Sequence, residues 1–148
     1  MTRLGRVVNG LALAAVLVGS SAAVYADDQD TIDYRQHVMK TLGEQAASIG
    51  MILQQKAPAE NFATHVKILA VSAAMAKKAF EPKVQGGDAK PEVWSNWADF
   101  AKKMDALAAA TDELAKTAAT GGVAAAGPKV KDALTCKGCH DTYRVPKK

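Results

Sequence analysis

Apolar residues recur every three or four positions along four stretches of the chain, and this spacing is the period of an α-helix. The first stretch covers residues 31–53 and the second covers residues 59–80. The third begins near Pro91 and is broken at residues 120–122, and the fourth covers residues 128–143. No long stretch alternates apolar and polar residues as a half-buried strand would. The pattern therefore predicts an all-α chain.

The connections between these stretches contain the expected helix breakers. Pro58 precedes the second stretch, and residues 85–91 contain two glycines and end in a proline. Proline suits the first turn of a helix, because its missing N–H has no intrahelical partner there. Four helices joined by modest loops form an antiparallel up-down four-helix bundle. We predict this fold for one domain, residues 27–148.

The composition agrees with a helical fold and adds a question about the core. The sequence of 148 residues is 49% hydrophobic but only 5% aromatic. Alanine supplies much of the apolar content, and alanine loses no side-chain entropy in a helix. A bundle with so few aromatic residues has a thin core of its own.

Residues 1–26 have the features of a signal peptide. Arg3 and Arg6 give a positive start, and an apolar run follows over residues 7–18. Val24-Tyr25-Ala26 then offers an acceptable cleavage site. The apolar run is too short for a typical membrane anchor, although an uncleaved anchor stays open as an alternative. We expect export to the periplasm, cleavage before Asp27, and no membrane attachment afterwards.

The charge of the chain excludes one class of partner. The formal net charge is +4, and the first 26 residues contribute two arginines and no acidic residue. The remaining domain is therefore close to neutral and lacks the basic stripe of a nucleic-acid-binding protein. The last residues, 144–148, are locally basic, which favours docking to an acidic partner.

A Cys-x-x-Cys-His motif stands near the end of the chain, at Cys136, Cys139 and His140. This motif is typical of the attachment site of a c-type haem. Each thiol forms a thioether with one vinyl group, and the imidazole binds the iron as the proximal ligand. On a helix, residues three and four apart project from the same face, so one segment holds both the ring edge and the metal. The motif predicts one covalently attached haem c, which would also enlarge the thin core.

Two other chemistries use a Cys-x-x-Cys pair, and the rest of the sequence supports neither. A redox-active pair usually lies in a βαβ context, which the hydrophobic pattern lacks. A zinc site needs two further Cys or His ligands at suitable spacing. His37 and His65 are isolated, and the chain has no other cysteine.

A second axial ligand for the iron must come from upstream of the motif, and methionine is a common choice that stabilises the reduced state. After residue 26 the chain has four methionines, namely Met39, Met51, Met75 and Met104. Met39 has the most suggestive neighbours, because Arg35 and Gln36 on the same helix face can bind the haem propionates. Gly43, one turn further on, would let a flat ring approach the backbone closely. An equally simple interpretation makes Met39 an ordinary core residue.

Three blocks of the sequence resemble the class II c-type cytochromes, the family of cytochrome c′ and cytochrome c-556. They are Tyr34-Arg35-Gln36-x-x-Met39, the loop and helix start at residues 86–94, and the haem segment at residues 136–144. The blocks come in the order of the family and span essentially the whole chain after residue 26. The resemblance implies an antiparallel four-helix bundle.

The resemblance also implies roles for individual residues. Cys136 and Cys139 would bind the haem covalently, and His140 would be the proximal ligand. Glu92 falls in a loop that borders the haem in relatives, and Arg144 matches an arginine close to the proximal face.

Arg35 and Gln36 match the residues that contact the propionates in that family. The residue at position 39 separates the family into two groups. In cytochrome c′ a bulky residue at this position covers a five-coordinate iron without binding it. In cytochrome c-556 a methionine there binds the iron and gives a six-coordinate electron carrier. Some five-coordinate relatives also carry methionine, so Met39 permits both states.

We therefore expect a periplasmic electron-transfer protein with His140 and Met39 as axial ligands and with periplasmic redox proteins as partners. The alternative is a five-coordinate cytochrome c′ that binds the diatomic gases nitric oxide or carbon monoxide. An enzyme such as a peroxidase would need a polar distal acid–base residue, and Met39 and Leu42 supply none, so we expect no enzymatic activity. The sequence leaves a monomer and a homodimer equally open.

Overall fold

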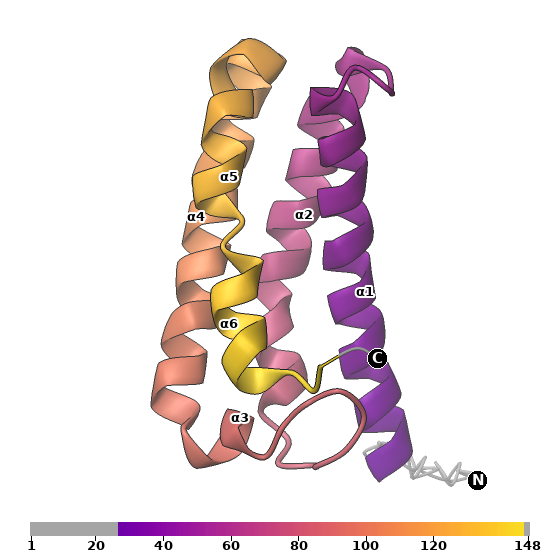
Figure 1. The fold of residues 1–148 in the computed structure, drawn as a ribbon, viewed down its shortest axis with the longest axis vertical. Coiled ribbons are helices and arrows are strands. Elements are labelled where there is room, and N and C mark those ends of the chain that lie inside the picture. Colours follow the sequence, from indigo (N-terminus) through magenta and orange to yellow (C-terminus); the bar gives the residue numbers. More distant parts are fainter. Residues whose placement is uncertain (1–26, 147–148) are drawn as a thin grey trace, which may run out of the picture.

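The structure is a computed structural model and describes residues 27–146. The predicted signal peptide, residues 1–26, lies outside the described residues. Within residues 27–146 the chain forms helices joined by short connections and contains no β-strand (Figure 1). The predicted all-α class is therefore confirmed.

Helix α1, Asp28–Leu53, begins three residues earlier than the hydrophobic pattern predicts. The side chain of Asp27 caps it by accepting a hydrogen bond of 2.7 Å from the backbone N–H of Asp30. Asp28 and Asp30 add negative charge to the first turn, where the helix dipole is positive. The earlier start is thus a capping effect that the apolar spacing does not contain.

Helix α2, Phe62–Ala76, runs antiparallel to α1 and is extended at both ends by short 3₁₀ turns, Ala59–Asn61 and Lys77–Phe80. Together these turns and α2 cover residues 59–80, the range that the sequence predicts for the second helix. A hydrogen bond of 2.8 Å between His65 Nδ1 and Gln45 Oε1 joins α2 to α1. His65 is therefore a structural residue between two helices.

The predicted third helix is divided into α3, Glu92–Ser95, and α4, Trp97–Ala126. Asn96 separates them with φ −122° and ψ 47°, which lie outside the helical region. Its side chain donates a hydrogen bond of 3.2 Å to the hydroxyl of Tyr143. Asparagine is a weak helix former, and this long-range contact accompanies a break that the apolar spacing does not reveal.

The predicted break at residues 120–122 is a kink inside α4. Gly122 has φ 55° and ψ −148°, and the helix resumes after it. The predicted continuous helix over residues 128–143 is wrong. It consists of a 3₁₀ turn, Gly127–Lys129, followed by α5, Val130–Ala133, and α6, Cys136–Tyr143. Leu134 and Thr135 leave the helical region between α5 and α6, so that α6 begins at Cys136 itself.

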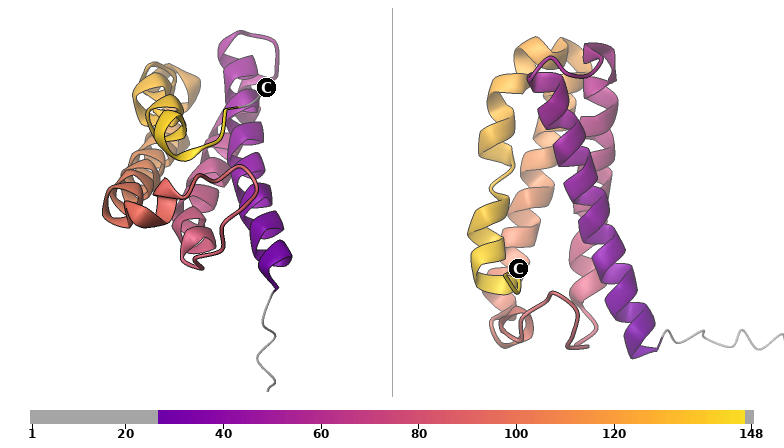
Figure 2. Two further views of the ribbon diagram at one scale, coloured as in Figure 1. Left: turned by 60° about the horizontal axis from the view of Figure 1, so that its bottom comes forward. Right: turned by 45° about the vertical axis from the view of Figure 1, so that its right-hand side comes forward.

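These helices form an antiparallel up-down four-helix bundle, as predicted (Figure 1). Helix α2 packs against α1 and α4, and α4 packs in turn against α5 and α6. Helices α5 and α6 follow one another in a single column beside α4 (Figure 2). Among residues 27–146, no helix is both long and apolar enough to cross a bilayer.

The core is closed at one end of the bundle and open at the other. Toward the C-terminal end of α1, large side chains are fully buried against one another, including Ile49, Phe62, Val66 and Leu114. Toward the N-terminal end of α1, the apolar side chains instead line a cavity. The haem motif of α6 lies beside this open end.

Candidate haem site

A cavity of about 780 Å³ lies between α1, α4 and the α5–α6 column. Its size falls within the range of about 300–1,000 Å³ that is usual for ligand and cofactor sites. Most of its wall is apolar, with contributions from Leu42, Leu69, Phe80, Val93, Phe100, Met104, Leu107 and Leu134. The cavity brings together side chains from the first and last helices of the bundle.

The proximal wall of this cavity is α6, and Cys136, Cys139 and His140 all line it. Because α6 begins at Cys136, the whole motif lies within its first two turns. Cys136 is exposed and Cys139 is half-buried, and both are free thiols. Burial raises the pKa of the Cys139 thiol, while the positive charge of Lys103 acts in the opposite direction. The three residues of the motif are thus presented together to one cavity.

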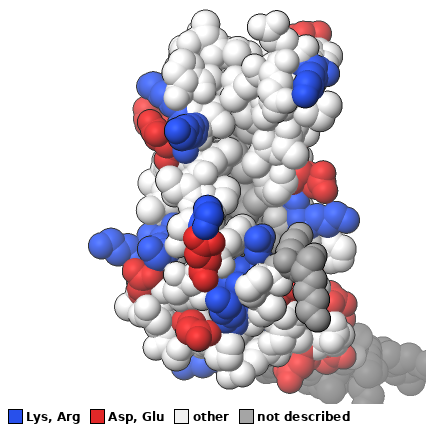
Figure 3. All heavy atoms as spheres, in the orientation of Figure 1, with Lys and Arg blue, Asp and Glu red and all other residues white. Residues whose placement is uncertain are grey.

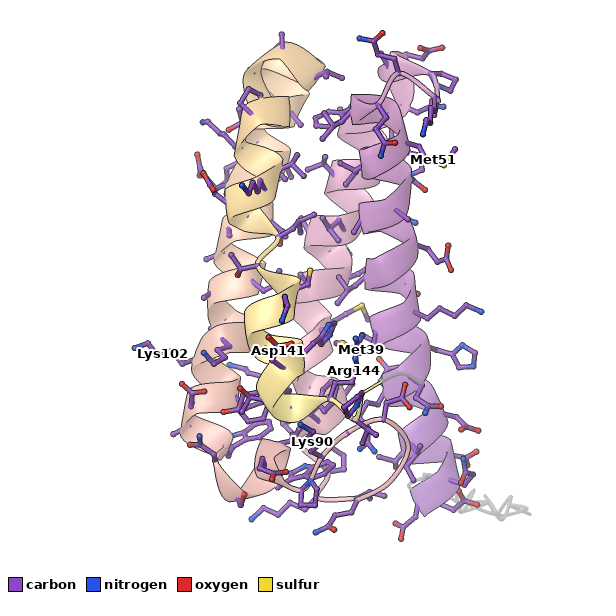
Figure 4. All side chains as sticks on the ribbon, in the orientation of Figure 1. Met39, Met51, Lys90, Lys102, Asp141 and Arg144 are labelled. Carbon is purple, nitrogen blue, oxygen red and sulfur yellow. The ribbon has the colours of Figure 1, made fainter. Side chains whose placement is uncertain are left out.

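The four methionines divide into two pairs. Met39 of α1 and Met104 of α4 line the cavity, whereas Met51 and Met75 are exposed outside it. Figure 4 shows Met39 projecting from α1 toward α6, and Met51 near the far end of α1. Gly43 also lines the cavity, and a Cβ added there would meet no atom within 4 Å. The space beside α1 is therefore open next to Met39.

Arg35 lines the cavity, but its guanidinium is already bound to the protein. It is 2% exposed and donates hydrogen bonds of 2.9 Å to the carbonyl oxygens of Val84 and Gly86. The guanidinium also lies over the rings of Phe80 and Trp94, at 5.5 and 5.1 Å from their centroids. Burial lowers the pKa of Arg35, although an arginine stays charged in proteins. Sequence reasoning gave Arg35 a role toward the propionates and missed these four partners.

Of the other three residues that the sequence singles out, two line the cavity and one does not. Gln36 and Arg144 line the cavity, Gln36 from α1 and Arg144 from the residue after α6. Glu92 begins α3, is exposed, and does not line this cavity. The structure therefore brings together all the predicted site residues except Glu92.

A polar cluster around the buried Tyr143 joins the end of α6 to the start of α4 and was not predicted. The Tyr143 hydroxyl donates a hydrogen bond of 2.6 Å to Asp99 Oδ2 and accepts one of 3.2 Å from Asn96. Its ring stacks edge-on against Phe100 at 5.2 Å. Burial and the bond to Asp99 raise the pKa of Tyr143 to about 12. No local sequence signal links Tyr143 to Asp99, because 44 residues separate them.

The donor set of the cavity fits a covalent c-type haem. Two free thiols three residues apart and an adjacent imidazole stand on one wall. The remaining walls are mainly apolar, which suits a porphyrin ring, and Gly43 leaves room beside α1. The same cavity offers methionine sulfur from α1 and α4 as iron ligands or as covers for the iron.

Comparison with known proteins gives the family. The family model for Cytochrome C' matches residues 30–144. Cytochrome c' of Alcaligenes xylosoxydans xylosoxydans is 30% identical over 83% of this chain and 99% of its own length. Cytochrome c' of Rubrivivax gelatinosus is 33% identical over 78% of the chain and 94% of its own length. Cytochrome c-556 of Agrobacterium fabrum is 28% identical over 90% of the chain and 94% of its own length.

Solved structures agree with the sequence relatives. A nitric oxide complex of a mutant of cytochrome c prime from Alcaligenes xylosoxidans has a TM-score of 0.74 and 30% identity, covering 82% of this chain and 99% of its own. A carbon monoxide-bound variant of the same protein has the same TM-score, identity and coverage. Proteins of this family bind a single covalent haem c, and so does this one. The chain belongs to the cytochrome c′ family of class II c-type cytochromes.

Proposed function

We propose that this protein is a periplasmic haem protein that binds diatomic gases, such as nitric oxide or carbon monoxide, at the face of the iron directed toward α1. In this proposal Cys136 and Cys139 attach the haem, and His140 is the proximal ligand. Met39 covers the face directed toward α1, opposite His140, without binding the iron. The protein binds its ligand reversibly and catalyses no reaction.

The observation that carries this proposal is an apolar patch of α1 that faces the cavity across from α6, beside the polar lining residues Arg35, Gln36, Lys40 and Glu44 of the same helix. Met39, Leu42 and Ala46 form this patch. A small uncharged gas needs no charged partner in such a patch, and it needs only enough room to reach the metal. When bound, the haem supplies an iron atom to which such a gas can coordinate. The nitric oxide and carbon monoxide complexes of the relative from Alcaligenes xylosoxidans support the same choice.

Electron transfer with Met39 bound to the iron is the second candidate. It is favoured by the position of Met39, which lines the same cavity as His140, and by the similarity to cytochrome c-556. Its partners would be periplasmic redox proteins. Charges of both signs lie interspersed on the face that carries α6 (Figure 3), including an ion pair of 2.5 Å between Lys137 and Asp141. Docking there would depend on mixed charges and not on a field of one sign.

Rapid mixing of the reduced holoprotein with carbon monoxide separates the two candidates. If Met39 only covers the iron, the binding rate rises in proportion to the gas concentration. If Met39 binds the iron, the rate reaches a plateau, because release of the thioether then limits binding. A plateau that disappears in Met39→Leu but persists in Met51→Leu would contradict gas binding as proposed. Met51 is the matched control, since it lies on α1 but outside the cavity.

A further inference from the structure

The loop that precedes α3 is fastened to α1 at one end of the haem cavity. We call residues 84–90 the strap. Arg35 donates one hydrogen bond of 2.9 Å to Val84 O and another of 2.9 Å to Gly86 O. Arg35 is almost fully buried, and the two carbonyls that it binds belong to half-buried residues. A planar fork can hold two carbonyls in a fixed relation, which a lysine cannot.

The backbone of the strap also lies directly against α1. A Cβ added at Gly86 would be 2.8 Å from Ile32 Cδ1. A Cβ added at Gly87 would be 2.7 Å from Gln36 Nε2 and 2.9 Å from Ile32 Cγ2. Gly87 has φ +57°, a conformation that other residues rarely adopt. Close approach and backbone conformation therefore both require glycine at this point.

The other end of the strap is fastened to the haem-attachment helix. Val145 N donates to Asp88 O at 2.9 Å, and Lys90 N donates to Tyr143 O at 3.0 Å. The Lys90 ammonium adds a bond of 3.2 Å to the Asp141 carbonyl, inside α6. Figure 2 shows the loop crossing between α1 and the end of α6, and Figure 4 shows Lys90 and Arg144 at this crossing.

We infer that the strap sets the separation of α1 from α6, and thereby the room for a ligand between Met39 and His140. The two helices make few direct contacts, so the strap joins the two sides of the cavity at this end, beside the packing of α1 and α6 through α2 and α4. Arg35 and Gly87 are then positioning residues for the site. Met39 lies one turn after Arg35 on the same helix face, so a shift of α1 at Arg35 moves Met39 as well. This inference rests on the proposed binding of gas beside Met39.

Substitution of Gly87 tests the strap without changing a residue that lines the cavity. In Gly87→Ala the new methyl group pushes the strap away from Ile32 and Gln36. The matched control is Gly122→Ala, because Gly122 has nearly the same φ, +55°, but no atom within 4 Å of its added Cβ. We expect carbon monoxide to bind the reduced Gly87→Ala holoprotein about tenfold faster, within the range usual for coupling between sites. Gly122→Ala should lower thermal stability but leave the rate at the wild-type value.

The inference is overturned if both variants lose thermal stability and neither changes the rate of carbon monoxide binding. If Gly87→Ala does not fold, Val145→Pro serves in its place, because it removes the N–H that binds Asp88 O. An unchanged rate in Val145→Pro would then overturn it. A wild-type protein with Met39 bound to the iron would refute the gas-binding proposal instead. In that case the strap predicts a larger high-spin fraction in Gly87→Ala than in Gly122→Ala, and equal fractions would refute the strap.

Discussion

Arg35 and Tyr143 show how buried polar side chains shape the rim of the haem cavity. Arg35 is bound to two backbone carbonyls of the strap, and Tyr143 is bound to Asp99 and Asn96. The sequence points to Arg35 through its spacing from Met39, but its partners lie 49 and 51 residues away. Helical periodicity reports neighbours within a few residues and cannot reveal such contacts. The residues of the haem motif, in contrast, were predictable because their chemistry is local.

Removal of the Met39 side chain should open the face of the iron directed toward α1. We expect Met39→Ala to bind carbon monoxide about tenfold faster, because the gas no longer has to displace a side chain at a cost of about 1.4 kcal/mol. Met51→Ala, an exposed position on the same helix, is the control and should keep the wild-type rate. Stopped-flow absorption of the reduced proteins measures both. Equal rates in Met39→Ala and the wild type would show that Met39 does not limit access.

Tyr143→Phe should weaken the protein and change its response to alkali. Loss of the hydroxyl leaves Asp99 and Asn96 without this partner, at a cost of about 1–2 kcal/mol in the free energy of unfolding near pH 8. The folded pKa of about 12 lies above the ordinary value of 10. The wild type therefore keeps this contribution below pH 10 and loses it as the pH rises toward 12, because the unfolded chain releases the proton first.

Urea unfolding of both holoproteins at several pH values between 8 and 11.5 checks this expectation. The difference between wild type and Tyr143→Phe should shrink as the pH rises. A difference that is constant across this range would contradict the raised pKa of Tyr143.

At the scale of elements, the sequence predicts the four helical columns better than their interruptions. The apolar period of 3.6 residues was sufficient for α1, α2 and most of α4. The chain leaves the helical region at Asn96 and at Leu134–Thr135. At the first break the Asn96 side chain donates a hydrogen bond to the Tyr143 hydroxyl. After the second break α6 begins at Cys136. Hydrophobic periodicity contains no record of such long-range contacts.

Side chains at the closed end of the bundle should contribute to the free energy of unfolding without affecting carbon monoxide binding at the haem site. Leu114 of α4 is fully buried there and does not line the cavity. We expect Leu114→Ala to lower the free energy of unfolding by about 2–5 kcal/mol, the usual cost of such a truncation in a core. Carbon monoxide binding should stay at the wild-type rate. Denaturant unfolding and rapid mixing measure the two quantities, and a changed binding rate would show that the two ends are coupled.

For the whole molecule, the haem completes a core that the chain leaves open. Side chains fill the bundle at one end, and a cavity of about 780 Å³ occupies the other. With 5% aromatic residues, the chain has few large side chains that could fill it. The low aromatic content and the haem motif together allowed this arrangement to be predicted. The position and volume of the cavity required the structure.

Loss of covalent attachment should therefore destabilise the entire fold. We expect the double variant Cys136→Ser with Cys139→Ser to be poorly folded or rapidly proteolysed, because its cavity keeps unfilled apolar walls. Thermal melting by circular dichroism and limited proteolysis measure this effect. A haem-free double variant that melts like the wild-type holoprotein would contradict it.

The central claim is that Met39 covers the haem iron of this protein and leaves its sixth position open to a gas. The visible absorption spectrum of the purified holoprotein, recorded in both oxidation states, tests this claim most directly. We predict high-spin, five-coordinate spectra in both states. Low-spin spectra with a thioether-to-ferric-iron band would contradict the claim and identify the protein as an electron carrier with His140 and Met39 bound to the iron.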